Sequence, residues 1–280
     1  MKIKILSDST CDLSPELVAA HDITLVPLVV NKDGNSYRDG VDIVPADIFA
    51  HVAAGGALCS TSALNMGDYE DIFKRYVSDY DGVVHINIGS GFSCCYQNAC
   101  LAAEEFSNVV VIDSRNLSTG QGLVVLKAAE LAKTCESLED LKAQLDEFTT
   151  KVEASFLLDQ LGYMVKGGRC SSVAALGANL LNLKPCIEVK DGKMSVVKKY
   201  RGNFNKSILN YVKDRLADRE DLDYGTVFVT HTPVADDTVD SVIEAVKQYG
   251  EFENLYHTNA GCTVSCHCGP GTLGVLFVRK

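Results

Sequence analysis

Hydroxyl-bearing side chains follow short apolar runs at five points of the chain. If the runs are strands of a parallel α/β sheet, the loops after them gather at one sheet edge, where such folds bind ligands. The groups are mostly neutral hydrogen-bond donors, which suits a small anionic or polar head. The five segments are Ser7–Thr10 after Ile3–Leu6, Ser60–Ser62 after Ala57–Cys59, Gly89–Ser93 after Val83–Ile88, Asp113–Ser114 after Val109–Ile112, and Thr230–Thr232 after Val227–Val229.

Two of these loops carry the strongest signals. In Gly89-Ser90-Gly91-Phe92-Ser93 the glycines permit close backbone approach, and the helix expected next offers free N–H groups and a positive dipole end beside Ser93. Ser93 is equally compatible with a plain helix N-cap, and Ser60-Thr61-Ser62 with an ordinary hydroxyl turn. The hydroxyls of Thr61 and Ser62 form a site only if they face Ser93.

A histidine close to the end of the chain is a further candidate. His267 lies in Cys266-His267-Cys268-Gly269-Pro270-Gly271, with Cys262 nearby. Structural zinc sites place their ligands in separate C-x₂₋₄-C pairs, and neighbouring residues of an extended segment point to opposite faces. We therefore expect no metal here, and interpret His267 as a donor to an anion or a proton-transfer group.

The residues leave two other functions open. Ser93 or Cys94 at a helix N-terminus could pair with His267 as nucleophile and base of an acyl hydrolase. The glycine loops at Gly89 and at Gly120-Gln121-Gly122 could instead hold a phosphorylated metabolite, although the latter lacks the third glycine of a dinucleotide fingerprint.

Two arginines sit beside glycines in the second half. Arg169 ends Lys166-Gly167-Gly168-Arg169, and Arg201 precedes Gly202. A guanidinium next to flexible backbone suits a phosphate or carboxylate, and it is equally compatible with a solvated surface loop.

Composition excludes several classes of protein. The 280 residues are 46% apolar and 22% charged, and the net charge of -11 argues against a nucleic-acid binder, which must neutralise phosphates. No apolar stretch reaches the roughly 18 residues that a membrane span needs. Eleven cysteines, an odd number, come without an export signal, so we expect reduced thiols and a cytoplasmic protein.

The order of predicted elements indicates two domains, at 1–160 and 161–280. In the first, strands alternate with helices, which is typical of a parallel sheet. In the second, a hairpin turning at Asp191-Gly192 precedes two helices and two further strands. The sequence predicts an α/β fold: an N-terminal Rossmann-like, mostly parallel sheet, a C-terminal α+β domain with a mixed sheet, and the ligand between them. The expected strands are 3–6, 25–30, 57–59, 83–88, 109–112, 185–189, 194–197, 226–229 and 273–278; the expected helices are 14–21, 45–53, 68–77, 94–106, 121–133, 137–150, 204–216 and 235–249.

An ordered set of short segments resembles the DegV family of bacterial fatty-acid-binding proteins. The likeness covers nearly the whole chain, and its specificity lies in the order of the set. The matching segments are Asp8–Leu13, Val26–Val30, Tyr37–Gly40, Thr61–Ser62, Phe92–Gln97, Ile112–Ser114, Leu161–Arg169, Leu180–Pro185, Asp191–Gly192, Arg201–Gly202 and His267–Gly271.

The resemblance implies a fatty acid in a tunnel between two α/β domains. Its carboxylate would be bound by Thr61, Ser62 and Ser93, with His267 nearby. Such a protein has no cofactor and no independent catalysis. It presents the lipid to a separate fatty acid kinase, which makes an acyl phosphate for phospholipid synthesis, and it contacts the membrane at most transiently.

Two further positions bear on that implied role. By the resemblance, Arg169 and Arg201 would lie at the rim, facing the phosphate or the kinase. The chain also departs from the family pattern, because Ser93-Cys94-Cys95-Tyr96 stands where the family usually has Ser-Gly-Thr-Tyr. Cys95 is a poorer donor than threonine.

Overall fold

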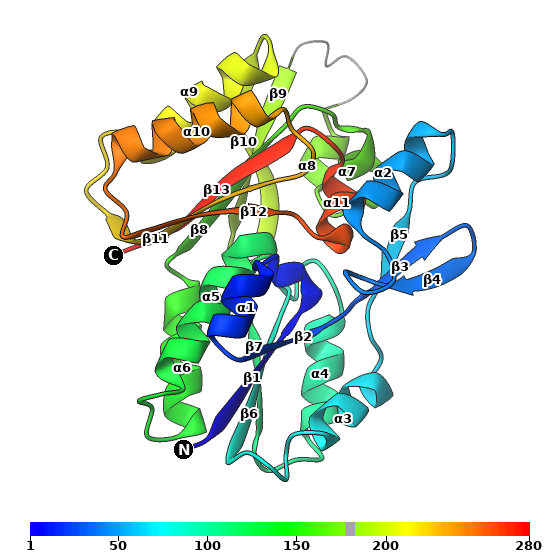
Figure 1. Cartoon of the computed structure of the whole chain (residues 1–280), viewed down its shortest axis with the longest axis vertical. Helices are drawn as coiled ribbons and strands as arrows, with labels where there is room; N and C mark the ends of the chain where they lie inside the picture. Colours follow the sequence, from blue (N-terminus) through cyan, green and yellow to red (C-terminus); the bar gives the residue numbers. More distant parts are fainter. Residues whose placement is uncertain (177–182) are drawn as a thin grey trace.

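A four-stranded parallel sheet organises the first half of the chain (Figure 1). In the computed structural model, which describes residues 1–176 and 183–280, its strand order is β2-β1-β6-β7. All three pairings are parallel, and β6 is buried along its whole length, as expected of a strand covered on both faces. The predicted Rossmann-like sheet is confirmed. Its strands are β1 (Ile3–Asp8), β2 (Ile23–Val26), β6 (Gly82–Asn87) and β7 (Val109–Asp113).

Helices cover this sheet, and one of them also supports the second sheet. α5 is buried over most of its length, because it packs against strands of both sheets. None of the helices in the described ranges is long and apolar enough to cross a membrane. The helices of this half, together with the 3₁₀ turn Ser9–Cys11, are α1 (Pro15–Ala20), α2 (Pro45–Ala53), α3 (Met66–Lys74), α4 (Cys95–Ala103), α5 (Ser118–Leu131) and α6 (Leu138–Thr149).

A six-stranded mixed sheet forms the second layer, in the order β10-β9-β8-β13-β11-β12. Only β11 and β12 pair in parallel, so the predicted mixed sheet is confirmed. α9 (Phe204–Leu216) and α10 (Asp236–Tyr249) cover one face (Figure 1), and the other face packs on α5. The strands are β8 (Val152–Leu158), β9 (Leu183–Lys190), β10 (Lys193–Arg201), β11 (Leu222–His231), β12 (Asn254–Asn259) and β13 (Thr272–Arg279).

Two of these strands, β8 and β12, were not predicted. β8 lies before residue 160 and pairs with β9 and β13, and the division into domains at residue 160 stays a prediction. Of the segments that carry the family resemblance, Leu180–Pro185 begins outside the described residues.

A small antiparallel sheet, β4-β3-β5, corrects two predictions. The expected strand 25–30 is divided, with Pro27 between β2 and β3 (Val29–Lys32); proline has no N–H to give to a ladder. The expected strand 57–59 is wrong, because β5 is the hydroxyl segment Ser60–Ser62 itself, paired with β3. The third strand is β4 (Asn35–Arg38).

The expectation that the five hydroxyl segments share one sheet edge is therefore wrong. The segments after β1, β6 and β7 lie at the carboxyl edge of the parallel sheet. Thr61 belongs to the small sheet and Thr230 to the six-stranded one. What brings Thr61 and Ser93 to one cavity is the stacking of the layers, which a strand-by-strand interpretation does not contain.

The histidine segment, expected to be extended, is the helix α11 (Cys262–Cys268). The Asp39 carboxylate accepts hydrogen bonds from the N–H groups of Cys262 (2.9 Å) and Thr263 (3.0 Å) and from the Thr263 hydroxyl (2.7 Å). A carboxylate there pairs the free amides and complements the helix dipole. The expectation that Cys266, His267 and Cys268 lie in an extended segment, on which we argued against a metal site, is thus wrong. The described residues nevertheless hold no cluster of three metal-ligating side chains.

A second buried carboxylate secures the same end of α11. Asp12, just after β1, accepts from the Gly261 N–H (2.8 Å) and from the Ser118 hydroxyl at the start of α5 (2.6 Å). Burial and, to a smaller extent, the nearby Asp39 charge raise the pKa of Asp12 to about 8. Asp12 thus ties α11 to the parallel sheet and to α5.

We predict that Asp12→Asn makes folding less sensitive to pH. An unfolded aspartate has a pKa of about 3.9, so the folded protein binds this proton more tightly. The stability it contributes is complete below that value and is lost as the pH rises through about 8. Asparagine can keep both contacts without titrating.

The measurement is urea unfolding at about pH 5 and about pH 7.5. From the lower to the higher pH, the free energy of unfolding of the wild type should fall by at least about 1 kcal/mol more than that of Asp12→Asn. Asp240→Asn, on the exposed side of α10, is the control and should behave like the wild type. Equal pH dependence in wild type and Asp12→Asn would contradict this role of Asp12.

Candidate functional site

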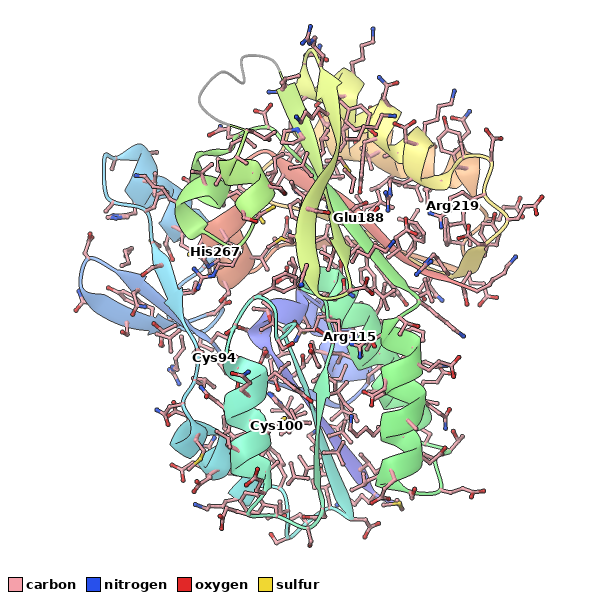
Figure 2. All side chains as sticks on the ribbon, turned by 180° about the vertical axis from the view of Figure 1, so that it is seen from behind. Cys94, Cys100, Arg115, Glu188, Arg219 and His267 are labelled. Carbon is pink, nitrogen blue, oxygen red and sulfur yellow. The ribbon has the colours of Figure 1, made fainter. Side chains whose placement is uncertain are left out.

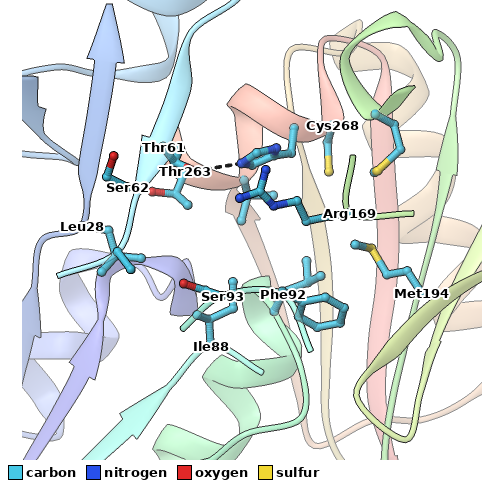
Figure 3. A pocket seen from close by; sticks show the side chains of 15 residues that line it. Leu28, Thr61, Ser62, Ile88, Phe92, Ser93, Arg169, Met194, Thr263 and Cys268 are labelled. Carbon is cyan, nitrogen blue, oxygen red and sulfur yellow. Dashed lines mark hydrogen bonds between the residues drawn. The ribbon is translucent and has the colours of Figure 1, made fainter. Parts of the chain in front are cut away.

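A cavity of about 70 Å³ lies where the parallel sheet, the small sheet and α11 meet (Figure 3). Figure 2, the view from behind, shows Cys94 in the lower half, which contains the parallel sheet, and His267 in the upper half, which contains the six-stranded sheet. Most of the lining residues are apolar, and six of them carry polar side chains. The lining residues are Leu28, Thr61, Ser62, Ala63, Ile88, Phe92, Ser93, Leu117, Met164, Arg169, Met194, Thr263, Val264, His267 and Cys268.

Thr61 and His267 meet directly, although 206 positions separate them in the sequence. The Thr61 Oγ1 and His267 Nε2 atoms are 2.8 Å apart (Figure 3). β5 supplies Thr61, held by its pairing with Val30 on β3, and the last turn of α11 supplies His267. The structure thus brings together two of the predicted site residues.

The imidazole of His267 is neutral near pH 7. Burial and, to a smaller extent, the positive charge of Arg169 lower the pKa of His267 to about 4. Nδ1 is buried without a partner, and an unpaired N–H there would cost more than an unpaired lone pair. The proton therefore belongs on Nε2, which donates to Thr61. This leaves the Thr61 hydroxyl proton free to donate into the cavity.

Ser93 approaches the cavity from the parallel sheet, at the turn that opens α4. Its Oγ accepts from the Cys95 N–H at 3.3 Å and lies 3.1 Å from the Cys95 Sγ. Figure 3 shows the Ser93 side chain among the lining residues, across from Thr61. The predicted N-cap role of Ser93 is wrong, because Cys94 occupies the N-cap position of α4. Ser93 lies one residue earlier and contributes a hydroxyl to the cavity lining.

The other predicted residues are placed differently. Ser62 lines the cavity, but its Oγ accepts from Asn31 Nδ2 at 2.8 Å on the exposed face of the small sheet. Strand alternation causes this, because Thr61 occupies the opposite face. Arg169 lies at the exposed rim, where its guanidinium donates to the Gly167 carbonyl (2.7 Å). Arg201, exposed at the end of β10, is not part of the cavity lining.

Sequence reasoning missed the residues that position His267. Asp39 is one of them, although it lies in the matched segment Tyr37–Gly40, which could have drawn attention to it. Gly167 is another, since a Cβ there would lie 2.6 Å from the His267 Nδ1. Only glycine lets α7 (Gly162–Gly167), which leads on to α8 (Ser171–Ala174), pack so closely on the imidazole.

A second, smaller cavity of about 30 Å³ lies on the side of the first that faces the six-stranded sheet. Leu117, Val264 and Cys268 line both, so these three side chains separate them. Its hydroxyl groups bond within the protein: Thr230 Oγ1 lies 2.6 Å from Thr119 Oγ1, and the Thr232 hydroxyl donates to the Thr272 carbonyl. The second cavity therefore presents mainly apolar surface.

The glycine loop before Ser93 serves packing rather than phosphate binding. The Asp113 carboxylate accepts from the Ser90 N–H (3.0 Å) and hydroxyl (2.6 Å), which occupies these donors and would repel a phosphate. A Cβ at Gly91 would lie 2.1 Å from the Gly192 carbonyl oxygen, in the hairpin of the second layer. Gly91 lets the two layers touch beside the cavity.

Comparisons with known proteins agree with this architecture. A family model described as "Uncharacterised protein, DegV family COG1307" matches residues 2–280. A DegV domain-containing protein of Clostridium acetobutylicum is 34% identical over 285 residues, covering 100% of this chain and 99% of that protein.

Solved structures show the same fold. A fatty-acid-binding DegV-family protein from Thermus thermophilus superposes with a TM-score of 0.89 at 30% identity, covering 100% of both chains. DegV, a fatty-acid-binding protein from Bacillus subtilis, gives a TM-score of 0.85 at 26% identity, again over 100% of both chains. A stearic-acid-binding protein from Eubacterium ventriosum gives 0.85 at 28%, over 99% of this chain and 98% of that one. This chain therefore belongs to the DegV family.

Proposed function

We propose that this protein binds a long-chain fatty acid and presents its carboxylate to a separate fatty acid kinase. The observation that carries the proposal is that the neutral polar side chains of Thr61, Ser93 and His267 line a mainly apolar cavity, with a second apolar cavity behind part of its wall. A carboxylate can accept from both hydroxyls while its alkyl tail follows the apolar path. The fatty acids bound by the structural relatives support this assignment.

The tail and the carboxylate of such a ligand contribute very different amounts to the free energy of binding. Burying about 14 methylenes at roughly 0.8 kcal/mol each contributes on the order of 11 kcal/mol before association costs. A neutral hydrogen bond contributes only about 0.5–1.5 kcal/mol net. The tail therefore sets the affinity and the hydroxyls set the position of the carboxylate, which a kinase must reach.

The tail needs more room than the two cavities hold. Their volumes are about 70 and about 30 Å³, against the roughly 300 Å³ or more of a typical ligand pocket. The partition formed by Leu117, Val264 and Cys268 must move for an acyl chain to pass. Met164 and Met194 in the lining are unbranched and adaptable, which suits a wall that yields to a ligand.

The hydrogen-bonding pattern disfavours an acyl hydrolase. His267 Nε2 bonds to Thr61, whereas the Ser93 hydroxyl bonds to Cys95, so serine and imidazole do not form a pair. With its pKa near 4, His267 is too weak a base to activate a hydroxyl efficiently at neutral pH. Cys94, the other predicted nucleophile, is exposed and does not line the cavity, and its Sγ lies 3.8 Å from Asn98 Nδ2.

Two exposed arginines support the part of the proposal that concerns the kinase. Arg169 stands beside the head-group cluster, and its exposed guanidinium can meet a phosphoryl group as it arrives. Arg201 supplies a second exposed cation on the same layer for the partner. A cytoplasmic setting belongs to the proposal, and the eleven cysteines, all within the described residues, are free of disulfides.

Protein purified from cells should release about one equivalent of long-chain fatty acid on denaturing extraction, detected by lipid mass spectrometry.

The double variant Thr61→Val/Ser93→Ala should bind palmitate about tenfold more weakly, since two hydrogen bonds to the carboxylate are lost. Ser241→Ala, on exposed α10, is the control. A lipid-free wild type that takes up no palmitate, or a double variant of unchanged affinity, would overturn the proposal.

For the partner, Arg201→Ala should bind palmitate normally but slow its phosphorylation by a fatty acid kinase about fivefold or more, because an exposed positive charge of the proposed partner surface is lost. Acyl phosphate formation is followed with radiolabelled ATP, and Lys199→Ala on the same strand is the matched control. An Arg201→Ala protein phosphorylated at the wild-type rate would remove Arg201 from the partner surface.

A further inference from the structure

Ser93 shares its hydroxyl with a buried thiol. Its Oγ receives the Cys95 N–H, and the same oxygen lies 3.1 Å from the Cys95 Sγ, in a geometry in which the hydroxyl donates to sulfur. A hydroxyl has one proton to give. While it points at Cys95, Ser93 cannot donate to a ligand in the cavity.

Behind Cys95 lies a polar cluster whose side chains have no exposed surface. The Asp8 carboxylate accepts from the Ile88 N–H (2.7 Å), from Asn87 Nδ2 (3.1 Å) and, at 3.5 Å, from the Tyr69 hydroxyl. The Tyr69 hydroxyl in turn lies against the Cys95 thiol. Because Asp8 can only accept, it fixes the direction of the Tyr69 hydroxyl, and the cluster holds Cys95 in place from behind.

The proton count at Ser93 permits two arrangements. With no ligand, the Ser93 hydroxyl donates to the Cys95 sulfur. With a carboxylate in the cavity, the hydroxyl turns toward it, and the thiol proton donates to the lone pair that Ser93 has freed. Burial, with the negative charge of Asp8, raises the pKa of Cys95 to about 11, so the thiol has a proton to give at neutral pH.

We propose that Cys95 is a positioning residue for carboxylate recognition, which exchanges the roles of acceptor and donor with Ser93 when a fatty acid binds. The inference rests on the proposed function. Sulfur is a weak partner in both directions, so the empty arrangement is given up at little cost. In the occupied arrangement the thiol polarises the Ser93 hydroxyl and strengthens its bond to the ligand.

The experiment compares wild type, Cys95→Thr, Cys95→Ala and Cys95→Val with [1-¹³C]palmitate. The pKa of the bound carboxyl is read from its ¹³C shift, and the affinity from displacement of a fluorescent fatty acid. Losing the partner of Ser93 should weaken palmitate binding about threefold to tenfold in the Ala and Val variants and raise the pKa of the bound carboxyl by about half a unit or more. Cys95→Thr, which keeps a donor, should stay close to wild type.

The Ser93→Ala background separates positioning from packing. There, Cys95→Ala should change neither the affinity nor the carboxyl pKa any further, because its effect passes through Ser93. Cys186→Ala removes a buried thiol from the apolar core that the six-stranded sheet forms with α9 and α10, and controls for loss of volume. An unchanged carboxyl pKa in both Cys95→Ala and Cys95→Val, or an equal effect of Cys95→Ala with and without Ser93, would overturn the proposal.

Failure of this inference differs from failure of the proposed function. A wild type that binds no palmitate refutes both. A wild type that binds palmitate with an affinity and carboxyl pKa indifferent to residue 95 refutes only the role of Cys95. If the Val variant does not fold, Cys95→Ala and Cys95→Thr still decide the matter, because the inference requires them to differ.

Discussion

The carboxylate of Asp39 at the first turn of α11 is the contact on which the rest of the site depends. It binds the backbone of Cys262 and Thr263, and Asp12 binds Gly261 just before them. A seven-residue helix has little stability alone, so its direction is set by what holds its ends. With that end fixed, the last turn carries His267 to Thr61, two layers of the molecule meet at one cavity, and the apolar residues of α11 become its wall.

The site is electrostatically mild where the ligand head would lie. His267 is neutral, the hydroxyls of Thr61 and Ser93 are neutral, and the exposed cation Arg169 stands at the rim. The buried charges, Asp8 and Asp39, are directed at backbone amides and protein side chains rather than at the cavity. Such a head-group cluster can hold a carboxylate in place without binding it so strongly that a product could not leave, which is the requirement for a protein that hands its ligand to another.

Patterns within single elements were predictable from the sequence. The apolar run 83–88, the N-cap at Ser14 with Pro15, and the hairpin at Asp191-Gly192 each depend on nearby residues, and each was expected correctly. α11 was missed because its cap, Asp39, comes from a distant part of the chain, and β5 was misplaced because its pairing with β3 is not encoded in Ser60–Ser62 alone. Thr61 and Ser93 were found as hydroxyls. Their relation to each other, and the turning of Ser62 away, follow from strand alternation and layer stacking, which no local pattern contains.

In the proposed function, Thr61 and Ser93 hold a fatty acid carboxylate while its tail passes between the two cavities. A crystal structure of the protein with bound palmitate tests this directly. We expect carboxylate oxygens within hydrogen-bond distance of Thr61 Oγ1 and Ser93 Oγ, with Leu117 and Val264 moved apart around the alkyl chain. A palmitate bound elsewhere, or one whose carboxylate lies at the six-stranded sheet and whose tail lies at Thr61, would contradict it.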